Sequence, residues 1–494
     1  MKVKSNNLNL SKKQYPPLTG QDKKLIIIFS IMLFLITFNY GMLRVMKDVQ
    51  VLKYANSHYT SFLKLWVVLF MFIFKAIYDI LAKRVGKNNM FYWLVGLFTL
   101  FFLTYNLFAA SFISEVPEGK HSYFFILRKI WPIVCFYVMA ETWGTYMLSV
   151  SFWSLANRTM SNQQAKRFYT TLSLGAAIST ILAGLIMIFV SEKENVIWVV
   201  IALNLVLVGV YYYFMRDMKL NPNLYSHGIT KKKKKKLGFF DSIKALFTSE
   251  DAGYLGLILL LVMGYGMGIN FFEVIYKQFV KDTGRALHAG NTDEAKQAVT
   301  FYTQKMFAYQ LIVVGVFSLC LVFLASLVKK RGWRFTASVV PGALGIGCIV
   351  FFGACYCKGA SMDEDTMNYL AIFGLCIVAI VKSSKYVFFD TTKEQTYKVC
   401  NEETQLTGKS AVDGIGSRLS KATSSFIVIQ VIMPLTGADS ILENKGVVGC
   451  CLFTVLAIWL WAVGALSKRY EKRLQAYEAE KKQLAKQAET EEKS

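Results

Sequence analysis

Long apolar runs, separated by short polar segments, dominate this sequence and restrict what it can fold into. An α-helix needs about 20 apolar residues to cross the roughly 30 Å hydrocarbon core of a bilayer. With 54% hydrophobic and 15% aromatic residues in 494 positions, the chain has more apolar surface than a soluble fold of this length can bury. We therefore predict an all-α membrane protein whose direct partner is the lipid bilayer.

Twelve runs qualify as membrane spans. Ten are clearly apolar: Leu25 to Leu43, Phe62 to Leu81, Phe91 to Ile113, Tyr169 to Val190, Val196 to Phe214, Gly253 to Tyr276, Phe307 to Val328, Thr336 to Cys357, Met367 to Phe389 and Val447 to Leu466. The fourth in chain order, Trp131 to Leu155, carries Glu141 and is bordered by Asn157. The eleventh, Ser410 to Met433, begins with charged residues and becomes apolar only at Phe426.

Basic residues indicate how these spans are oriented. Lysine and arginine gather within 2–24, 83–87, 158–167, 231–236 and 329–334, and after position 467. With twelve spans all of these segments fall on one side, which the positive-inside rule makes cytoplasmic, so both termini are expected there. This topology explains much of the formal net charge of +24, and the six-lysine run is better read as a solvated linker than as a nucleic-acid site.

The N-terminal segment has no features of a cleavable targeting sequence. Its first 24 residues are rich in lysine but lack the apolar core of a signal peptide and the Arg and Ser bias of a transit sequence. We expect a bacterial inner membrane protein.

Two weak similarities between short segments suggest an internal repeat. Asn39 and Tyr40 at the end of the first span match Asn270 and Phe271 in the seventh, about 230 residues later. The segment FWSLAN, which starts at position 152, matches FFDTTK, which starts at 388. A parallel repeat of six-helix halves is typical of major-facilitator-like transporters. The predicted domains are an N-terminal segment (1–24), a first half (25–215), a basic linker (216–250), a second half (251–467) and a cytoplasmic tail (468–494).

Charged side chains lie within these spans or at their ends. A charge near the bilayer centre costs about 2.5–3.5 kcal/mol even on the gentler insertion scales, so water, a partner or a substrate must compensate it. In major-facilitator folds the first and fourth helices of each half line a central cavity, and by analogy the charges belong there. Lys64, Lys75 and Asp79 of the second span do not fit this rule. Alternatively, the charges form ion pairs that lock the halves together. The group comprises Arg44, Lys47, Asp48, Glu141, Glu273, Lys277, Lys385 and Asp390.

The basic members of this group outnumber Glu141 and Glu273. This excess favours an organic polyanion as the substrate. Lysine and arginine donate charge-assisted hydrogen bonds to phosphate oxygens. Aromatic residues nearby are candidates to stack on a base, although such residues more often face lipid or the core. They are Tyr40, Trp143, Phe152, Trp153 and Tyr386.

Enzymatic sites find little support. Gly408, Lys409 and Ser410 look like the end of a phosphate-binding loop, but Glu403 stands where its first glycine is required. The four histidines are isolated, and with the nine cysteines they form no metal-binding pattern. We expect no enzyme activity, no cofactor and no metal.

Several segments in order carry a family resemblance. They are NYGMLRVMKD from Asn39, ETWG from Glu141, FWSLANRTMSNQQAKRFY from Phe152, NFFEVIYK from Asn270, KYVFFDTTKEQTY from Lys385 and GKSAVD from Gly408. The chain resembles the nucleotide transporter (ATP/ADP translocase) family of obligate intracellular bacteria and plastids, from about position 25 to 466. The resemblance implies a twelve-helix carrier that exchanges ATP for ADP by alternating access.

The resemblance also implies particular transport residues. The family's first-span lysine and its two glutamates correspond to Lys47, Glu141 and Glu273, and its late lysine corresponds to Lys385 or Lys409. Together with the charges and matched segments above, the substrate-binding candidates are Arg44, Lys47, Glu141, Asn157, Asn270, Glu273, Lys277, Lys385, Asp390 and Lys409.

The chain departs from the family pattern at several points. Arg158 replaces an uncharged or acidic residue, Gln164 a glutamate and Tyr276 a tryptophan, and the run KVCNEE after Tyr397 lacks an Ile-Pro-Leu segment. These differences leave open another nucleotide, or proton-coupled import with Glu141 or Glu273 as the proton-coupling carboxylate. A membrane receptor or scaffold that keeps the fold without transport is the remaining alternative.

Overall fold

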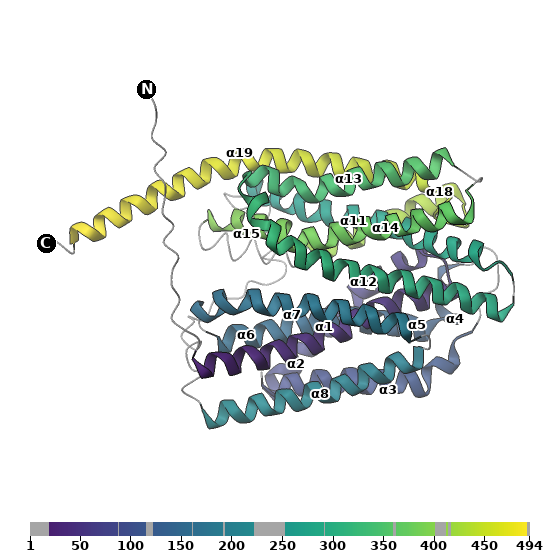
Figure 1. Cartoon of the computed structure of the whole chain (residues 1–494), viewed down its shortest axis with the longest axis horizontal. Helices are drawn as coiled ribbons and strands as arrows, with labels where there is room; N and C mark the ends of the chain where they lie inside the picture. The colour runs from purple at the N-terminus through teal and green to yellow at the C-terminus, as the bar shows by residue number, and fades with distance from the viewer. Residues whose placement is uncertain are drawn as a thin grey trace.

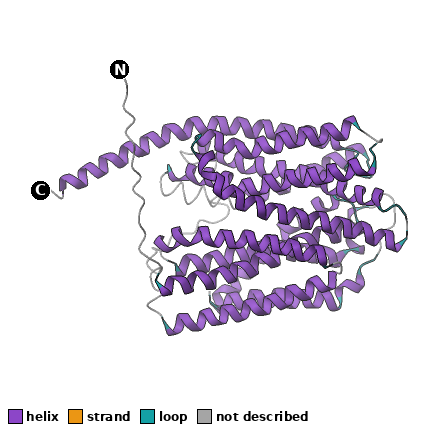
Figure 2. Ribbon diagram, viewed as in Figure 1, coloured by secondary structure: helices purple, strands orange, loops and turns teal. Residues whose placement is uncertain are grey.

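The computed structural model describes residues 19–86, 88–114, 122–160, 162–190, 193–221, 252–290, 292–358, 362–400, 412 and 416–491. Within these ranges every regular element is a helix (Figure 2). The helices run roughly side by side along the long axis of the molecule, and α1 begins on the same side on which α19 ends (Figure 1). We call this side the termini end and the other side the opposite end.

The first half contains six membrane-length helical stretches within residues 19–221. Its elements are α1 (Gly20–Tyr54), α2 (His58–Val85), α3 (Asn89–Leu107), η1 (Ala109–Phe112), α4 (Tyr123–Lys129), α5 (Trp131–Trp143), η2 (Gly144–Phe152), α6 (Trp153–Thr159), α7 (Asn162–Phe189) and α8 (Lys193–Leu220). Thr19 and Asp22 start α1 with a capping box, in which each side chain accepts the other residue's backbone N–H.

The second half contains the other six stretches within residues 252–491. Its elements are α11 (Ala252–Leu287), α12 (Asp293–Lys329), α13 (Trp333–Cys357), α14 (Glu364–Ser384), η5 (Lys385–Phe389), α15 (Asp390–Lys398), α17 (Ser417–Phe426), η7 (Ile427–Ile432), α18 (Met433–Thr436) and α19 (Lys445–Glu491). The predicted all-α fold with twelve spans is confirmed, and the protein is a multi-pass membrane protein.

The helices differ from the predicted spans at their ends. The first span was expected to end at Leu43, but α1 continues to Tyr54, and α11 likewise runs eleven residues past Tyr276. Helix α12 begins at Asp293 instead of Phe307. Backbone hydrogen bonds do not stop where an apolar run stops, so a helix continues wherever packing supports its polar turns.

Several of the predicted segment boundaries fall inside helices, because the helices are longer than expected. Helix α8 continues to Leu220, so the first residues of the predicted linker are helical, and positions 222–250 lie outside the described residues. Helix α19 continues through the predicted tail to Glu491. The N-terminal segment up to residue 18 also lies outside the described part of the chain.

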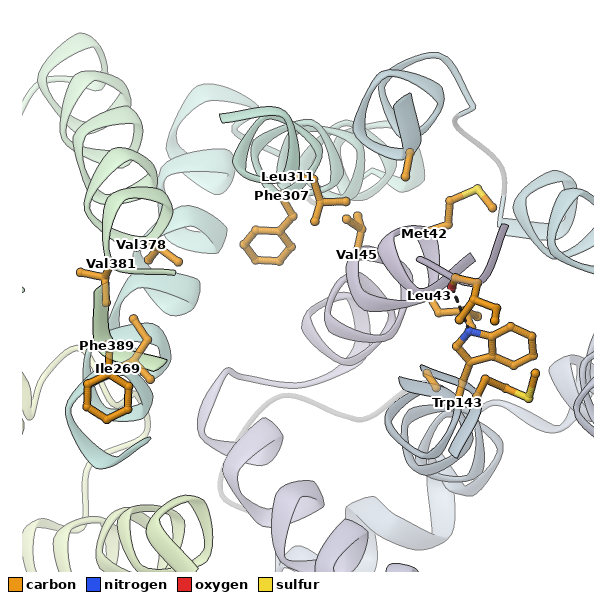
Figure 3. Close-up of a cluster of buried hydrophobic side chains, with 14 of the residues drawn as sticks. Met42, Leu43, Val45, Trp143, Ile269, Phe307, Leu311, Val378, Val381 and Phe389 are labelled. Atoms are coloured by element: carbon orange, nitrogen blue, oxygen red, sulfur yellow. Dashed lines mark hydrogen bonds between the residues drawn. The ribbon is translucent and has the colours of Figure 1, made fainter. Parts of the chain in front are cut away.

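The two halves pack against each other through α7 and α12. A Cβ at Gly184 would come within 2.7 Å of the Ala308 carbonyl oxygen, and one at Gly315 within 2.4 Å of Ile181. Small residues let helix backbones approach closely within a membrane, where no hydrophobic effect drives association. Beside this contact, Val45 of α1 and Leu311 of α12 point toward each other (Figure 3). The contact between α7 and α12 is therefore closely packed.

Gly347 on α13 tests how closely the second half is packed. A Cβ there would lie 2.7 Å from the buried Ile377 side chain of α14, whereas one at Gly353 on the same helix would meet nothing within 4 Å. We predict that Gly347→Val destabilises the purified protein by about 1–3 kcal/mol, because overpacking forces neighbouring side chains to move. Thermal unfolding in detergent measures the loss, with Gly353→Val as the matched control. Equal melting temperatures of the two variants would contradict close α13–α14 packing.

Candidate substrate-binding site

Three candidate charges share one face of α1. Residues three and four apart are neighbours on a helix, so Arg44 lies next to both Lys47 and Asp48. Because α1 continues to Tyr54, these residues lie within the helix instead of in a loop beyond it. Lys47 is 4% exposed, and Arg44 and Asp48 are half-buried.

The buried Lys47 ammonium binds two carboxylates. Its Nζ lies 3.0 Å from Asp48 Oδ1 and 3.0 Å from Glu141 Oε1 on α5. It also lies 4.1 Å from the centre of the Tyr137 ring, one turn before Glu141. The sequence-predicted residues Lys47 and Glu141 therefore contact each other, and the cation is compensated inside the first half.

Two polar contacts connect this group to the second half. Lys277 Nζ of α11 lies 2.8 Å from the other oxygen of Asp48, so this carboxylate bridges lysines from the two halves. Lys64 of α2 donates to Asn270 Oδ1 of α11. Through its amide nitrogen Asn270 donates to Ser424 Oγ of α17 at 2.7 Å.

Further charges surround this bridge. Glu273 of α11 binds Lys382 of α14 at 2.5 Å, and Arg44 lies within electrostatic range of both Glu273 and Glu141. The central charge cluster, as we call it, comprises Arg44, Lys47, Asp48, Lys64, Glu141, Glu273, Lys277 and Lys382. Its five basic side chains and three carboxylates leave an excess of positive charge.

Lys385 and Asp390 form a second, smaller group. Lys385 Nζ lies 2.9 Å from Asp390 Oδ2 and also 5.5 Å from the centre of the Tyr265 ring. Tyr265 is in electrostatic range of Arg44, Glu273 and Asp390, so this tyrosine lies near both the small group and the central charge cluster.

A π-helical segment lies at matching places in the two halves. In the first half η2 begins three residues after Glu141, and in the second half η5 begins at Lys385 itself. Such wide turns are rare in proteins, and many of those that occur lie at functional sites. At η2 the Tyr40 ring lies against Gly144, where a Cβ would come within 2.4 Å of the ring. The pairing follows the repeat expected between positions 152 and 388.

Other candidates lie apart or outside the described residues. Asn157 is exposed on α6 and accepts a hydrogen bond from the Tyr169 hydroxyl at 2.8 Å. Lys409 lies outside the described residues, so the choice between Lys385 and Lys409 stays open.

Some candidate aromatic residues lie close to the charges, and others lie apart from them. Trp143 and Phe152 are fully buried, and the Trp143 indole donates to the Ile36 carbonyl in the core of the first half (Figure 3). Trp153 packs on the Tyr169 ring, 5.0 Å between centroids. Tyr40 and Tyr386 remain close to the charges, since both lie in electrostatic range of Arg44. Tyr386 is 59% exposed.

Sequence reasoning missed three basic residues near the central charges. Lys64 was noted only as an exception, and Lys382 lies inside the predicted tenth span. Lys421 of α17 is in electrostatic range of Glu141. The signal that could have found all three is the same: a single lysine in or beside an apolar run. The first-and-fourth-helix rule excluded Lys64 and Lys421, whose helices are the second and eleventh spans.

Hydrogen bonds join the halves at the opposite end. Lys281 of α11 donates to the Ala55 carbonyl at 2.9 Å and to Asn56 Oδ1 at 3.2 Å, just after α1 ends. The Ser57 backbone N–H donates to Gln278 Oε1 at 2.8 Å. Near the same end Gln304 of α12 donates to the carbonyl of Met187 on α7 at 2.8 Å. These bonds hold the two halves together at this end.

The chain is similar in sequence to carriers of Rickettsia. It is 28% identical over 510 residues to ADP,ATP carrier protein 3 of Rickettsia bellii, covering 92% of this chain and 96% of that protein. It is 26% identical over 505 residues to ADP,ATP carrier protein 1 of Rickettsia prowazekii, covering 94% and 97%.

Solved transporter structures share the fold at low sequence identity. A POT family transporter in complex with 5-aminolevulinic acid superposes with a TM-score of 0.59 at 10% identity, covering 90% of this chain and 97% of that chain. The nucleoside transporter NupG gives 0.56 at 13% identity, covering 90% and 98%. Both support the major-facilitator-like fold expected from the sequence.

Residues 2–470 match the family described as TLC ATP/ADP transporter, which confirms the resemblance found in the sequence. This family and the structural neighbours are transporters and not enzymes. The chain therefore belongs to the TLC ATP/ADP transporter family.

Proposed function

We propose that this protein is a nucleotide carrier that exchanges ATP for ADP across a bacterial inner membrane, with both termini in the cytoplasm. The observation that carries the proposal is the meeting of basic residues from both halves at one carboxylate, Asp48, within the membrane-spanning part of the chain. The excess positive charge around this carboxylate suits the phosphates of a nucleotide. The Rickettsia relatives are named ADP,ATP carriers, which supports the same substrate.

The proposed binding mode uses exchange of ion-pair partners. Lys47 and Lys277 are both held by Asp48. Phosphate oxygens accept the same charge-assisted hydrogen bonds as a carboxylate, so a bound nucleotide can replace Asp48 as the partner of either lysine. Tyr40 and Tyr386 are the candidates to contact the base.

The proposed transport mechanism is alternating access. Lys281, Gln278 and Gln304 hold the halves together at the opposite end, which would face the periplasm under the positive-inside rule. Substrate would then enter and leave from the cytoplasmic side in this conformation. Breaking these bonds, while new contacts form at the termini end, would expose the site to the other side.

The alternative is proton-coupled import of a nucleotide, and the presence of Glu141 and Glu273 in the central charge cluster is the observation that favours it. Both carboxylates are paired with lysines, at 3.0 Å and 2.5 Å. Binding of phosphates to Lys47 or Lys382 would release a carboxylate that could accept a proton. Exchange remains the proposal because the relatives are named for both nucleotides, as ADP,ATP carrier proteins.

Transport in liposomes tests the proposal directly. The purified protein is reconstituted into vesicles loaded with ADP, and uptake of labelled ATP is followed. We expect uptake that requires internal nucleotide and is indifferent to an imposed pH gradient. Uptake without internal nucleotide that follows the pH gradient would replace exchange by proton symport. A protein that moves none of the nucleotides tested would be a receptor or scaffold instead.

Lys47 provides a test of substrate contact. We predict that Lys47→Gln weakens ATP binding by about ten-fold or more, because a hydrogen bond to a charged group contributes about 1.5–3 kcal/mol. Binding is measured by calorimetry on folded protein in detergent. Lys75→Gln is the control, since Lys75 is exposed on α2 and pairs only with Asp79 among the described residues.

The double variant Lys47→Gln/Glu141→Gln separates a substrate contact from a structural ion pair. Removing both partners avoids leaving a buried carboxylate unpaired, so the double variant should fold better than Lys47→Gln. We expect ATP binding to stay weak in it. If affinity returned to the unmodified level in the double variant, Lys47 would have a structural role only.

Lys281 tests closure at the opposite end. We predict that Lys281→Met raises the population open at that end by about ten-fold or more, because hydrogen bonds from a charged donor to Ala55 and Asn56 are lost. Spin labels at Phe112 and Leu435, in a background without native cysteines, report the distance between the halves. Lys53→Met is the control, because Lys53 is exposed and contacts the ring of Tyr54 on its own helix. Unchanged distances in Lys281→Met would show that these bonds do not hold the halves together.

A further inference from the structure

A basic pocket lies at the termini end of the first half. Its cavity of about 850 Å³ is formed where α2 ends, α3 begins and α8 ends, with Arg158 of α6 contributing to its wall. Helices α3 and α8 lie on the outer side of the first half, away from the second half (Figure 1). The pocket is therefore separate from the central charge cluster between the halves.

Three basic side chains line this pocket without a carboxylate partner among the described residues. Arg158 donates through Nη1 to Asn88 Oδ1 at 3.1 Å, while its Nε is buried and has no hydrogen-bond partner in that part of the chain. Arg216 and Lys219 are exposed on α8. The carboxylate nearest in sequence, Asp217, binds Lys24 at 2.5 Å. A buried guanidinium nitrogen without a partner indicates a missing acceptor.

The surface beside the pocket is apolar and exposed. On α8 Leu205 is 63% and Leu220 68% exposed, and on α3 Leu100 is 62% exposed. Such faces of a membrane-spanning helix contact lipid chains. Tyr92 and Tyr212 line the pocket where these faces end, and tyrosine is enriched at the level of lipid headgroups.

We propose that this pocket binds a phosphate group, and that the phosphate belongs to an anionic phospholipid whose acyl chains lie along α3 and α8. Basic pockets between helices on the cytoplasmic side of a membrane are suited to such headgroups. Arg158 contributes the unpartnered Nε and extends the basic surface formed by Arg216 and Lys219. A free phosphate or nucleotide has the same acceptor chemistry, but it would make no use of the exposed apolar faces.

Binding of defined lipids to the full-length protein in detergent tests the proposal. Native mass spectrometry measures the affinity for phosphatidylglycerol and for zwitterionic phosphatidylcholine, and separate titrations use inorganic phosphate and ATP. The test variants are Arg216→Gln/Lys219→Gln and Arg158→Gln. The matched control is Lys83→Gln/Arg84→Gln, which removes two exposed charges near the same end from α2, outside the pocket.

We expect Arg216→Gln/Lys219→Gln to weaken phosphatidylglycerol binding about 30-fold, because each basic residue beside an anionic membrane surface contributes roughly five-fold. The control should stay within about two-fold of the unmodified protein, since its charges lie outside the pocket. Equal effects of the test and control variants, or equal affinity for the two lipids, would overturn the proposal. Competition by inorganic phosphate or ATP at the same residues, without selective lipid binding, would overturn the assignment to lipid. The exposed pair keeps the test valid even if Arg158→Gln fails to fold.

Discussion

Asp48 and its two lysines form the ion pairs that join the two halves within the central charge cluster. One carboxylate accepts from Lys47 of the first half at 3.0 Å and from Lys277 of the second half at 2.8 Å. Charges inside a membrane are costly unless they are paired or bind a substrate. This bridge pairs one carboxylate with two lysines and at the same time joins the two halves. Under the proposed function, a nucleotide that competes for these lysines would also change the contact between the halves, because the same carboxylate holds both.

The two halves share features at matching places along the chain, but the side chains at these places have different contacts. The π-helical segments η2 and η5 lie in the fourth and tenth spans, close to Glu141 and Lys385. In contrast, the matching asparagines have different partners. Asn39 donates to Asn204 of α8 within the first half, whereas Asn270 contacts Lys64 across the interface. Similar residues thus occupy matching positions along the helices of the two halves, while helix packing determines what each of them contacts.

The protein carries two groups of positive charge with different surroundings. The central charge cluster mixes lysines with carboxylates, so its lysines are paired within the protein. The pocket at the end of α8 has no carboxylate partner for Arg158 among the described residues and opens beside lipid-facing side chains. The first arrangement suits a substrate that must bind and leave, and the second suits a ligand that stays.

Much of this protein follows from its sequence alone. The length and spacing of apolar runs determined the twelve spans, because the bilayer requires about 20 residues per helix. Charges within those runs or just beyond their ends pointed to Lys47, Glu141, Glu273 and Lys277, because only compensated charges persist there. Tertiary structure decided which charges meet: Lys64 of the second span contacts Asn270, and Lys382 pairs with Glu273. It also placed the Trp143 side chain in the core. Which side chains of a helix are buried depends on how neighbouring helices pack, and a pattern along one helix does not contain that information.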